Sequence, residues 1–253
     1  MPSVSRLAVT PVKGLALVHP EEVEVTPTGV PENRRFFLVD GRGKRWSGTK
    51  DGPLFGVRAE TDRDATRLAL TFPDGRVVDA PVELGERRFT AFWDRPVWGH
   101  VVEGPWAEAL SELLGEPVHL MRADEPGGGF DAWPISLLSD ASLEELARRS
   151  GEERVDGRRF RMLVHVAGTR PHEEDEWLGR RLRLGEVVVR VTEPDARCRM
   201  TTRNPDTGIK DFDTVRSIRR YRGLRNGKHA DFGVYADVER PGRIRVGDPV
   251  EPL

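Results

Sequence analysis

The chain has 253 residues, of which 40 are Lys or Arg and 42 are Asp or Glu, so its formal net charge is only −2. This length suffices for one large domain or two modest ones, and the balanced charge gives no overall basic field for nucleic acid. No apolar run approaches the roughly 20 residues that span a bilayer, and residues 1–6 begin no signal peptide or presequence. We therefore expect a cytoplasmic protein with neither a membrane nor a nucleic-acid partner.

The first part of the chain is rich in β-strand signals. Short runs of β-prone residues are separated by turn residues, and the strongest hairpin signal is the Asp40-Gly41 turn. A second hairpin turn is expected at Pro73-Asp74-Gly75. The runs cover residues 4–12, 23–25, 34–46, 57–60, 67–72 and 76–78. This pattern predicts a β-meander that closes into a barrel or packs as a sheet.

The remainder mixes helices with strands. Residues 105–115 have helical periodicity and end at Gly115, a typical C-cap, and residues 139–149 begin with a Ser or Asp N-cap. Predicted strands cover residues 118–121, 160–166, 182–184, 187–191, 232–238 and 242–250. Arg161 interrupts one of them and would need an anionic or carbonyl partner. The fold class predicted is mainly β with a few helices (α+β).

Three further stretches have ordinary interpretations. Residues 126–129 contain three glycines but lack the Lys-Ser/Thr of a phosphate loop, so we interpret them as flexible surface. The acidic cluster at 173–176 is interpreted as a solvated loop, in which one carboxylate can pair with a facing arginine. His165 has no metal-ligand spacing and is expected to be solvated or internally bonded.

Cys198 is the only cysteine, so it can form neither an internal disulfide nor a four-thiolate metal site. Three roles stay open for it: a buried packing residue, a reactive thiolate, or a single ligand to a metal. If the segment is extended, Arg197 and Arg199 point away from the face of Cys198 but lie close enough to favour a thiolate or to bind an anion. Residues 204–208 then predict a turn, in which Gly208 takes a positive φ.

Dispersed cations accompany this thiol, namely Lys13, Arg35, Arg161 and Arg222. Together they suit a polyanionic ligand that also supplies a metal. A Ser-His-Asp site is not supported because no nucleophile-elbow spacing occurs. Pairing of Cys198 with His165 or His229 as a protease also lacks a local signature.

Several motifs, in this order, resemble those of MOSC-domain proteins of the amidoxime-reducing-component type, where MOSC denotes the molybdenum cofactor sulfurase C-terminal domain. The C-terminal motifs are Arg197-Cys198, Thr201-Thr202, Pro205-Asp206-Thr207-Gly208, Tyr221-Arg222, Phe232-Gly233, Tyr235 and 246–250. Residues 11–14 and 35–39 resemble the family's N-terminal β-barrel region. The resemblance implies that region at residues 1–100 and a β-barrel MOSC domain at 101–253, with the alternative that the two interlock.

The resemblance also implies that a molybdenum cofactor, a pyranopterin dithiolene, is bound with the Cys198 thiolate as metal ligand. Cys198 and Asp131 are the candidate catalytic residues. The candidate cofactor-binding residues are Lys13, Gly14, Arg35, Arg161, Arg197, Cys198 and Tyr235. Three departures from the family pattern are Gly14 in place of serine, Met162-Leu163 in place of Pro-Asn, and Ala196 in place of a small polar residue.

The activity implied is two-electron reduction of N-hydroxylated small molecules with cleavage of the N–O bond. With a single cysteine, the chain cannot hold an iron–sulfur cluster of its own, so a separate electron donor is implied, either ferredoxin-like or cytochrome b5-like with a reductase. Two alternatives stay open. The protein is a carrier of the cofactor or of sulfur without reductase activity, or it is a metal-free protein in which Cys198 is packed and another anion binds.

Overall fold

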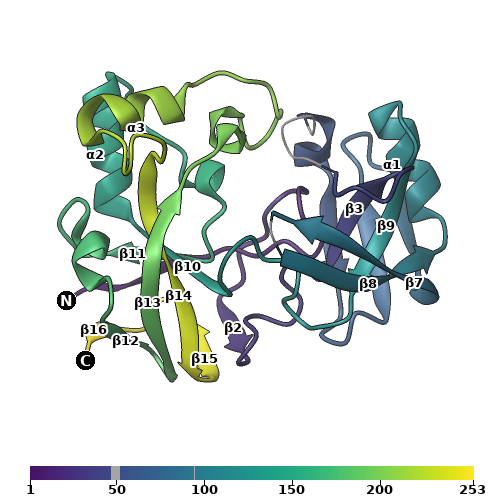
Figure 1. Ribbon diagram of the computed structural model, residues 1–253, viewed down its shortest axis with the longest axis horizontal. Helices are drawn as coiled ribbons and strands as arrows, with labels where there is room; N and C mark the ends of the chain where they lie inside the picture. The colour runs from purple at the N-terminus through teal and green to yellow at the C-terminus, as the bar shows by residue number, and fades with distance from the viewer. Residues whose placement is uncertain (47–51, 94) are drawn as a thin grey trace.

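The computed structural model describes residues 1–46, 52–93 and 95–253. Its fold is mainly β, as predicted, with three α-helices in the described part of the chain. Two β-rich bodies lie side by side and are joined by several crossings of the chain (Figure 1). We call them the first body, which contains β3 to β9, and the second body, which contains β10 to β16.

The second body is built on a curved sheet of seven strands in the order β1-β11-β10-β14-β13-β12-β16. The strands are β1 (Ser3–Leu7), β11 (Val164–Ala167), β10 (Ile135–Ser139), β14 (Asp231–Arg240), β13 (Val187–Ala196), β12 (Arg181–Leu184) and β16 (Val250–Pro252). The outer strands approach one another, because Val4 N donates to the Asp248 carbonyl at 2.8 Å and Val250 N donates to that of Pro2 at 2.9 Å. The sheet is therefore a nearly closed barrel, as predicted for this part of the chain.

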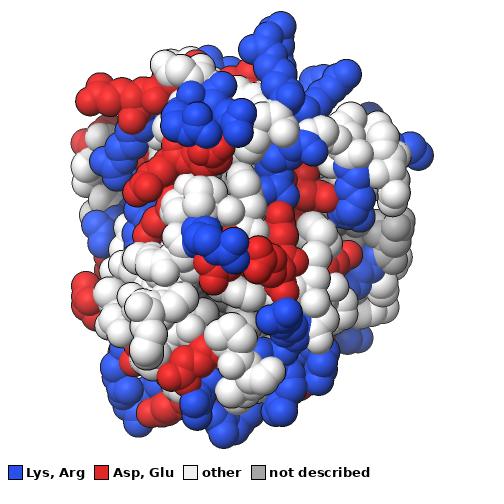
Figure 2. Space-filling view, turned by 90° about the vertical axis from the view of Figure 1, so that its left-hand side faces the viewer, with Lys and Arg blue, Asp and Glu red and all other residues white. Residues whose placement is uncertain are grey.

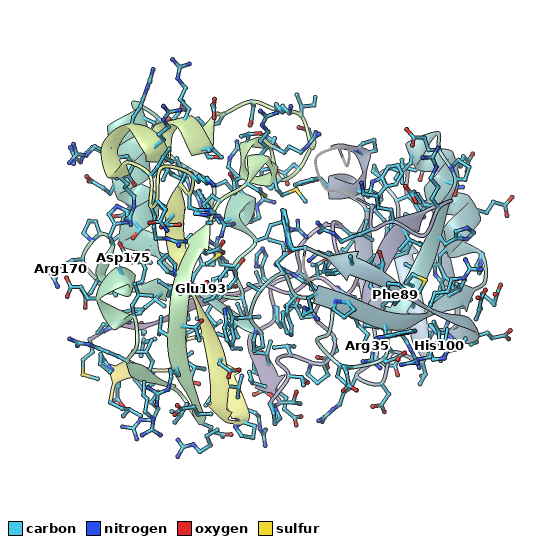
Figure 3. All side chains as sticks on the ribbon, viewed as in Figure 1. Arg35, Phe89, His100, Arg170, Asp175 and Glu193 are labelled. Atoms are coloured by element: carbon cyan, nitrogen blue, oxygen red, sulfur yellow. The ribbon has the colours of Figure 1, made fainter. Side chains whose placement is uncertain are left out.

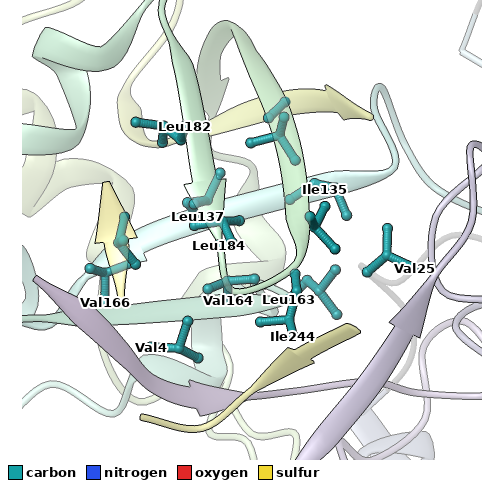
Figure 4. Close-up of a cluster of buried hydrophobic side chains, with 14 of the residues drawn as sticks. Val4, Val25, Ile135, Leu137, Leu163, Val164, Val166, Leu182, Leu184 and Ile244 are labelled. Carbon is teal, nitrogen blue, oxygen red and sulfur yellow. The ribbon is translucent and has the colours of Figure 1, made fainter. Parts of the chain in front are cut away.

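Apolar side chains from all around this barrel form its core (Figure 4). Leu7, Ile135, Val164, Leu184 and Ile244 are each fully buried there. Burial of a side chain of this size contributes about 1.5–3 kcal/mol. The barrel is thus stable enough to hold the ends of its strands, and the segments that follow them, in fixed positions.

The first body contains a four-stranded sheet in the order β3-β9-β8-β7 and a three-stranded meander, β4-β5-β6. Their bounds are β3 (Phe36–Asp40), β4 (Arg58–Thr61), β5 (Arg67–Thr71), β6 (Val77–Pro81), β7 (Glu83–Phe92), β8 (Arg95–Glu103) and β9 (Val118–Ala123). The predicted meander and its turn at Gly75, where φ is +86°, are confirmed. The core here includes Phe36, Trp106 and Leu120.

The first two strands do not join this meander, contrary to the prediction. β1 pairs antiparallel with β11, and β2 (Glu22–Val25) pairs with β15 (Gly242–Arg245), both in the second body. Conversely, β9 pairs with β3 in the first body, and the predicted boundary after residue 100 falls inside β8. The two regions interlock in this way, and the sequence limits of each domain stay a prediction.

Two of the three helices agree with their sequence signals. α1 (Trp106–Leu114) ends at Gly115 with φ +67°, and in α2 (Asp140–Ser150) the Ser139 side chain accepts from Ser142 N as an N-cap. α3 (Thr214–Arg222) was not predicted. The predicted strand at 160–166 begins only at Val164, because the preceding residues form a 3₁₀ turn, η2 (Gly157–Phe160), which ends at Arg161.

Candidate functional site

Cys198 lies two residues beyond the end of β13. Its backbone is extended, with φ −107° and ψ 175°, and the chain then enters a 3₁₀ turn, η4 (Arg199–Thr202). The expected extended segment therefore holds as far as Cys198 and fails from Arg199 onward. The thiol side chain is exposed, which excludes the packed-residue reading.

The turn at residues 204–208 holds this loop against the first body. Gly208 has φ +67°, as predicted, and its N–H donates to the Asn204 carbonyl at 2.8 Å. A Cβ at Gly208 would collide with the carbonyl oxygen of Gly52, which belongs to the first body. The glycine therefore allows the two backbones to meet and fixes where the Cys198 loop sits.

A cluster of three cations surrounds Asp131, and we call it the Asp131 cluster. Lys13 Nζ lies 3.0 Å from Asp131 Oδ1, Arg34 Nη1 lies 3.0 Å from Oδ2, and Arg45 Nη1 lies 3.8 Å from Oδ1. Burial lowers the pKa of Lys13 to about 7, although Asp131 opposes this shift. Burial also disfavours the charged form of Asp131, but Lys13 and Arg34 outweigh it and hold the pKa of that carboxyl below its usual range. The cluster has more positive than negative charge and suits an added anion.

The glycine run beside this cluster is buried, so its interpretation as flexible surface is wrong. Lys13 Nζ donates to the Gly129 carbonyl at 2.9 Å, and Arg95 Nη2 donates to the Gly128 carbonyl at 3.0 Å. A Cβ at Gly129 would collide with the Arg34 carbonyl oxygen. These glycines are needed for close packing, and they place the Gly129 carbonyl against Lys13 and the Gly128 carbonyl against Arg95.

A second cluster comprises Asp195 and Arg197, which lie close to Cys198 in the sequence, and Tyr235 from β14. Asp195 forms an ion pair with Arg197, and both side chains are almost completely buried. Burial raises the pKa of Asp195 to about 6, against the attraction of Arg197 and a hydrogen bond from Tyr235. Burial and the neighbouring Asp195 raise the pKa of Tyr235 above its usual range. Sequence reasoning missed Asp195, whose only signal is its position two residues before Arg197.

The two clusters meet at the backbone of residues 160–161. Arg34 Nη2 donates to the Arg161 carbonyl at 3.1 Å, and Arg197 Nη2 donates to the neighbouring Phe160 carbonyl at 2.6 Å. Arg161 itself has φ +55°, and its side chain donates to the Leu15 carbonyl at 2.6 Å, which is the carbonyl partner its position required. Electrostatic effects agree with this proximity, since the Asp131 carboxylate contributes to raising the pKa of Arg197.

Among the predicted site residues, the structure gathers these charged and aromatic side chains from both bodies: Lys13, Asp131, Arg161, Arg197 and Tyr235. Gly14 follows Lys13 in a tight turn with φ +99°, which favours glycine there. Arg161 also lines a cavity of about 360 Å³ between the bodies, together with Phe55, Arg58, Arg158 and Pro205.

Arg35 lies elsewhere. Its side chain is only 7 % exposed and sits near Arg122, Asp124 and Glu125, and burial together with Arg122 lowers its pKa. Arg35 and His100 both lie in the first body, on the right in Figure 3. Its neighbour Arg34, with φ +55°, is the arginine that reaches Asp131. Cofactor binding by Arg35, which the family resemblance implies, stays a prediction.

Two other interpretations have clear outcomes. The acidic cluster is not a solvated loop but a 3₁₀ turn, η3 (Glu173–Trp177), in which Glu174 is fully buried. Asp175 pairs with Arg222 at 2.6 Å, so one carboxylate of the cluster does pair with a facing arginine, as predicted. His165 is internally bonded, with Nδ1 lying 3.1 Å from Arg6 Nη2.

In residues 1–46, 52–93 and 95–253, no three His, Cys, Asp or Glu side chains gather in an arrangement that could hold a metal. None of the helices in the described chain is long and apolar enough to cross a membrane.

The architecture is that of a two-body β protein with an exposed thiol that follows directly on the buried Arg197, and comparison with known proteins agrees with this β architecture. Residues 1–117 match the MOSC N-terminal beta barrel domain and residues 124–251 match the MOSC domain. The chain is 35% identical to mitochondrial amidoxime-reducing component 1 of Homo sapiens, over 98% of this chain and 82% of that protein. It therefore belongs to the MOSC family.

Two further proteins are similar to this chain over different lengths. The Mus musculus amidoxime-reducing component 1 is 39% identical over 127 residues, which are 47% of this chain and 36% of that protein. Among solved structures, the YUAD protein from Bacillus subtilis aligns over 99% of this chain and 94% of its own, with 12% identity and a TM-score of 0.46.

Proposed function

We propose that the protein is a molybdenum-cofactor-dependent reductase of N-hydroxylated compounds. The observation that carries this proposal is an exposed thiol, Cys198, in a fold that gathers cationic side chains from both bodies. The chain is also related to amidoxime-reducing components. The reaction is R–NHOH + 2 e⁻ + 2 H⁺ → R–NH₂ + H₂O. A separate protein electron donor and a cytoplasmic location are part of the proposal.

The residues present fit such a cofactor. A soft thiolate suits a redox metal, and Arg and Lys suit a phosphate. The Nε atoms of Arg95 and Arg197 are buried and have no hydrogen-bond partner within the described residues, so each is a donor that a ligand can satisfy. Because Lys13 has a pKa of about 7, an anion at the Asp131 cluster would also stabilise its charged form.

Each residue of the site then has a defined role. Lys13, Arg34 and Arg161 would hold the anionic end of the cofactor, and the Cys198 thiolate would hold its metal. Asp195, with a pKa of about 6, can keep a proton at its carboxyl in mildly acidic solution, and it accepts a hydrogen bond from Tyr235. When bound, the cofactor supplies the two-electron couple for N–O cleavage.

The test is reduction of an amidoxime, benzamidoxime, by cofactor-loaded protein with reduced methyl viologen as electron donor. Cys198→Ser should lose the activity and most of the molybdenum measured by elemental analysis, whereas Met200→Leu, two residues away, should keep both. Unchanged turnover in Cys198→Ser would contradict the proposal. Molybdenum and pterin retained by the wild type without turnover would favour the carrier function instead.

A further inference from the structure

A set of exposed cations lies on α3 and on the segments between Cys198 and α3. It comprises Arg199, Lys210, Arg216, Arg219 and Arg220, and we call it the α3 cationic surface. Within the described residues, no carboxylate pairs with any of these five side chains, and none makes a side-chain hydrogen bond. Lys and Arg side chains gather at the top of the molecule in Figure 2, the end that carries α3 in Figure 1.

This lack of pairing is unlike the surface around it. Many exposed arginines on other elements are paired, such as Arg63 with Glu24 at 2.6 Å and Arg181 with Glu239 at 2.6 Å. The acidic residues near the α3 cationic surface interact with other groups. Asp206 and Asp211 pair with Arg158 and Arg159, and the Asp213 carboxylate caps α3 by accepting from Arg216 N. Local acids therefore leave the positive charge largely uncompensated.

The cations on α3 share one side of the helix. Arg216, Arg219 and Arg220 are spaced i, i+3 and i+4, so their side chains are neighbours, while Ile218 is fully buried on the other side. η4 packs against the start of α3, where Thr201 Oγ1 lies 2.5 Å from Thr214 Oγ1. The surface therefore runs from the segment that carries Cys198 onto the exposed face of α3.

We propose that the α3 cationic surface is the docking site of an acidic protein that carries electrons to the site at Cys198. The inference rests on the proposed function, which needs two electrons per turnover from outside a chain with one cysteine. Complementary charge raises the rate of encounter, and redox complexes typically have small, transient interfaces below about 1,200 Å². Two docking events by a one-electron carrier deliver the two electrons, each carrier being oxidised once, with two protons taken from water.

The experiment uses a plant-type acidic [2Fe–2S] ferredoxin as the probe, in its oxidised form for binding and its reduced form for turnover. The test variant is Arg216→Glu/Arg219→Glu/Arg220→Glu. The control is Arg180→Glu/Arg183→Glu/Arg240→Glu, which reverses three exposed charges on and beside β12 and β14, far below α3 in Figure 1. A neutral Arg216→Gln/Arg219→Gln/Arg220→Gln variant and thermal unfolding separate lost docking from lost folding.

Three results are expected. Wild type and control bind the ferredoxin by calorimetry at low salt, and affinity falls as salt rises. The test variant binds at least about tenfold more weakly and loses most of the salt dependence. Its turnover with ferredoxin falls through a raised KM, while turnover with reduced methyl viologen stays within about twofold, because a small donor needs no docking surface.

Equal ferredoxin binding and turnover in the test variant and the control would overturn the docking site while leaving the proposed function intact. Binding of anionic phospholipid vesicles or of single-stranded RNA, without binding of ferredoxin, would overturn it as well. If the cofactor-loaded wild type shows no turnover with reduced methyl viologen, the proposed function itself would be overturned.

Discussion

Lys13 and Asp131 form an ion pair of 3.0 Å between the turn that enters the first body and the segment that leaves it. The pair is mostly shielded from water, with side-chain exposures of 14 % and 33 %. Because Arg34 and Arg45 also lie next to Asp131, this carboxylate compensates three cations drawn together by the fold. The ion pair therefore holds these two connecting segments together and also limits the positive charge available to a ligand.

Asp131→Asn should destabilise the protein by about 1–3 kcal/mol, because it leaves partly buried cations without their counter-charge. The measurement is urea unfolding at pH 6, where Lys13 is charged. In Glu86→Gln, which breaks an exposed pair with Arg88, unfolding should be unchanged. The additional change Lys13→Met should recover part of the loss; an additive double variant would show that the two residues are not coupled.

Anion affinity at the Asp131 cluster should fall as pH rises through about 7. Lys13 carries a proton below its pKa of about 7 and loses it above, so an anion must bring that proton back at higher pH. Sulfate is a suitable probe because its own charge does not change over this range. Calorimetry at pH 6 and pH 8 should give up to about tenfold weaker binding at pH 8. Lys13→Arg should flatten the profile, and a flat wild-type profile would contradict the role of Lys13.

Asp195→Asn should cost less stability at neutral pH than in acid. Asp195 has an unfolded pKa of 3.8 and a folded pKa of about 6, so between these pH values the folded state binds more protons than the unfolded state. The contribution of this group to stability is therefore largest in acid and falls as the pH rises from about 4 to about 6. Asparagine has no such dependence. The destabilisation measured by urea unfolding should therefore be smaller at pH 7 than at pH 4, by about 1–3 kcal/mol. Asp64→Asn, an exposed change, is the control and should alter stability at pH 7 by less than about 0.5 kcal/mol.

Gly129→Ala should destabilise the protein by about 1–3 kcal/mol, because its Cβ would meet the Arg34 carbonyl oxygen and the backbone would have to shift. Gly41→Ala is the matched control, since nothing lies within 4 Å of a Cβ there, and it should change stability by less than about 0.5 kcal/mol. Thermal unfolding of both variants provides the comparison. Equal melting temperatures would show that the glycine run can move.

Elements with local signals were predicted, and elements that depend on distant contacts were not. The β4-β5-β6 meander and the caps of α1 and α2 follow from alternation, turn residues and capping residues within a few positions. α3 was missed because its buried side has few apolar residues, chiefly Ile218, among arginines that resemble a solvated loop. Its stability depends on packing against residues far away in the sequence.

The site shows the same limit at the level of single residues. Adjacent arginines at 34 and 35 are indistinguishable in sequence, and the positive φ of Arg34 helps to direct it toward Asp131. The glycine run looks like an exposed loop until the backbone of Arg34 is seen against it. Composition and spacing do not report such contacts, since they exist only after the two bodies have assembled.

The pairing of β1 with β11 has a consequence for how the chain is made. During synthesis, residues 3–7 emerge before the first body, but their antiparallel partner at 164–167 emerges only after the whole first body has left the ribosome. Long-range pairing of this kind is slow, and an unpaired strand can associate with other chains. We therefore expect the barrel to complete late, with β1 needing protection by a chaperone or by transient packing until β11 is available.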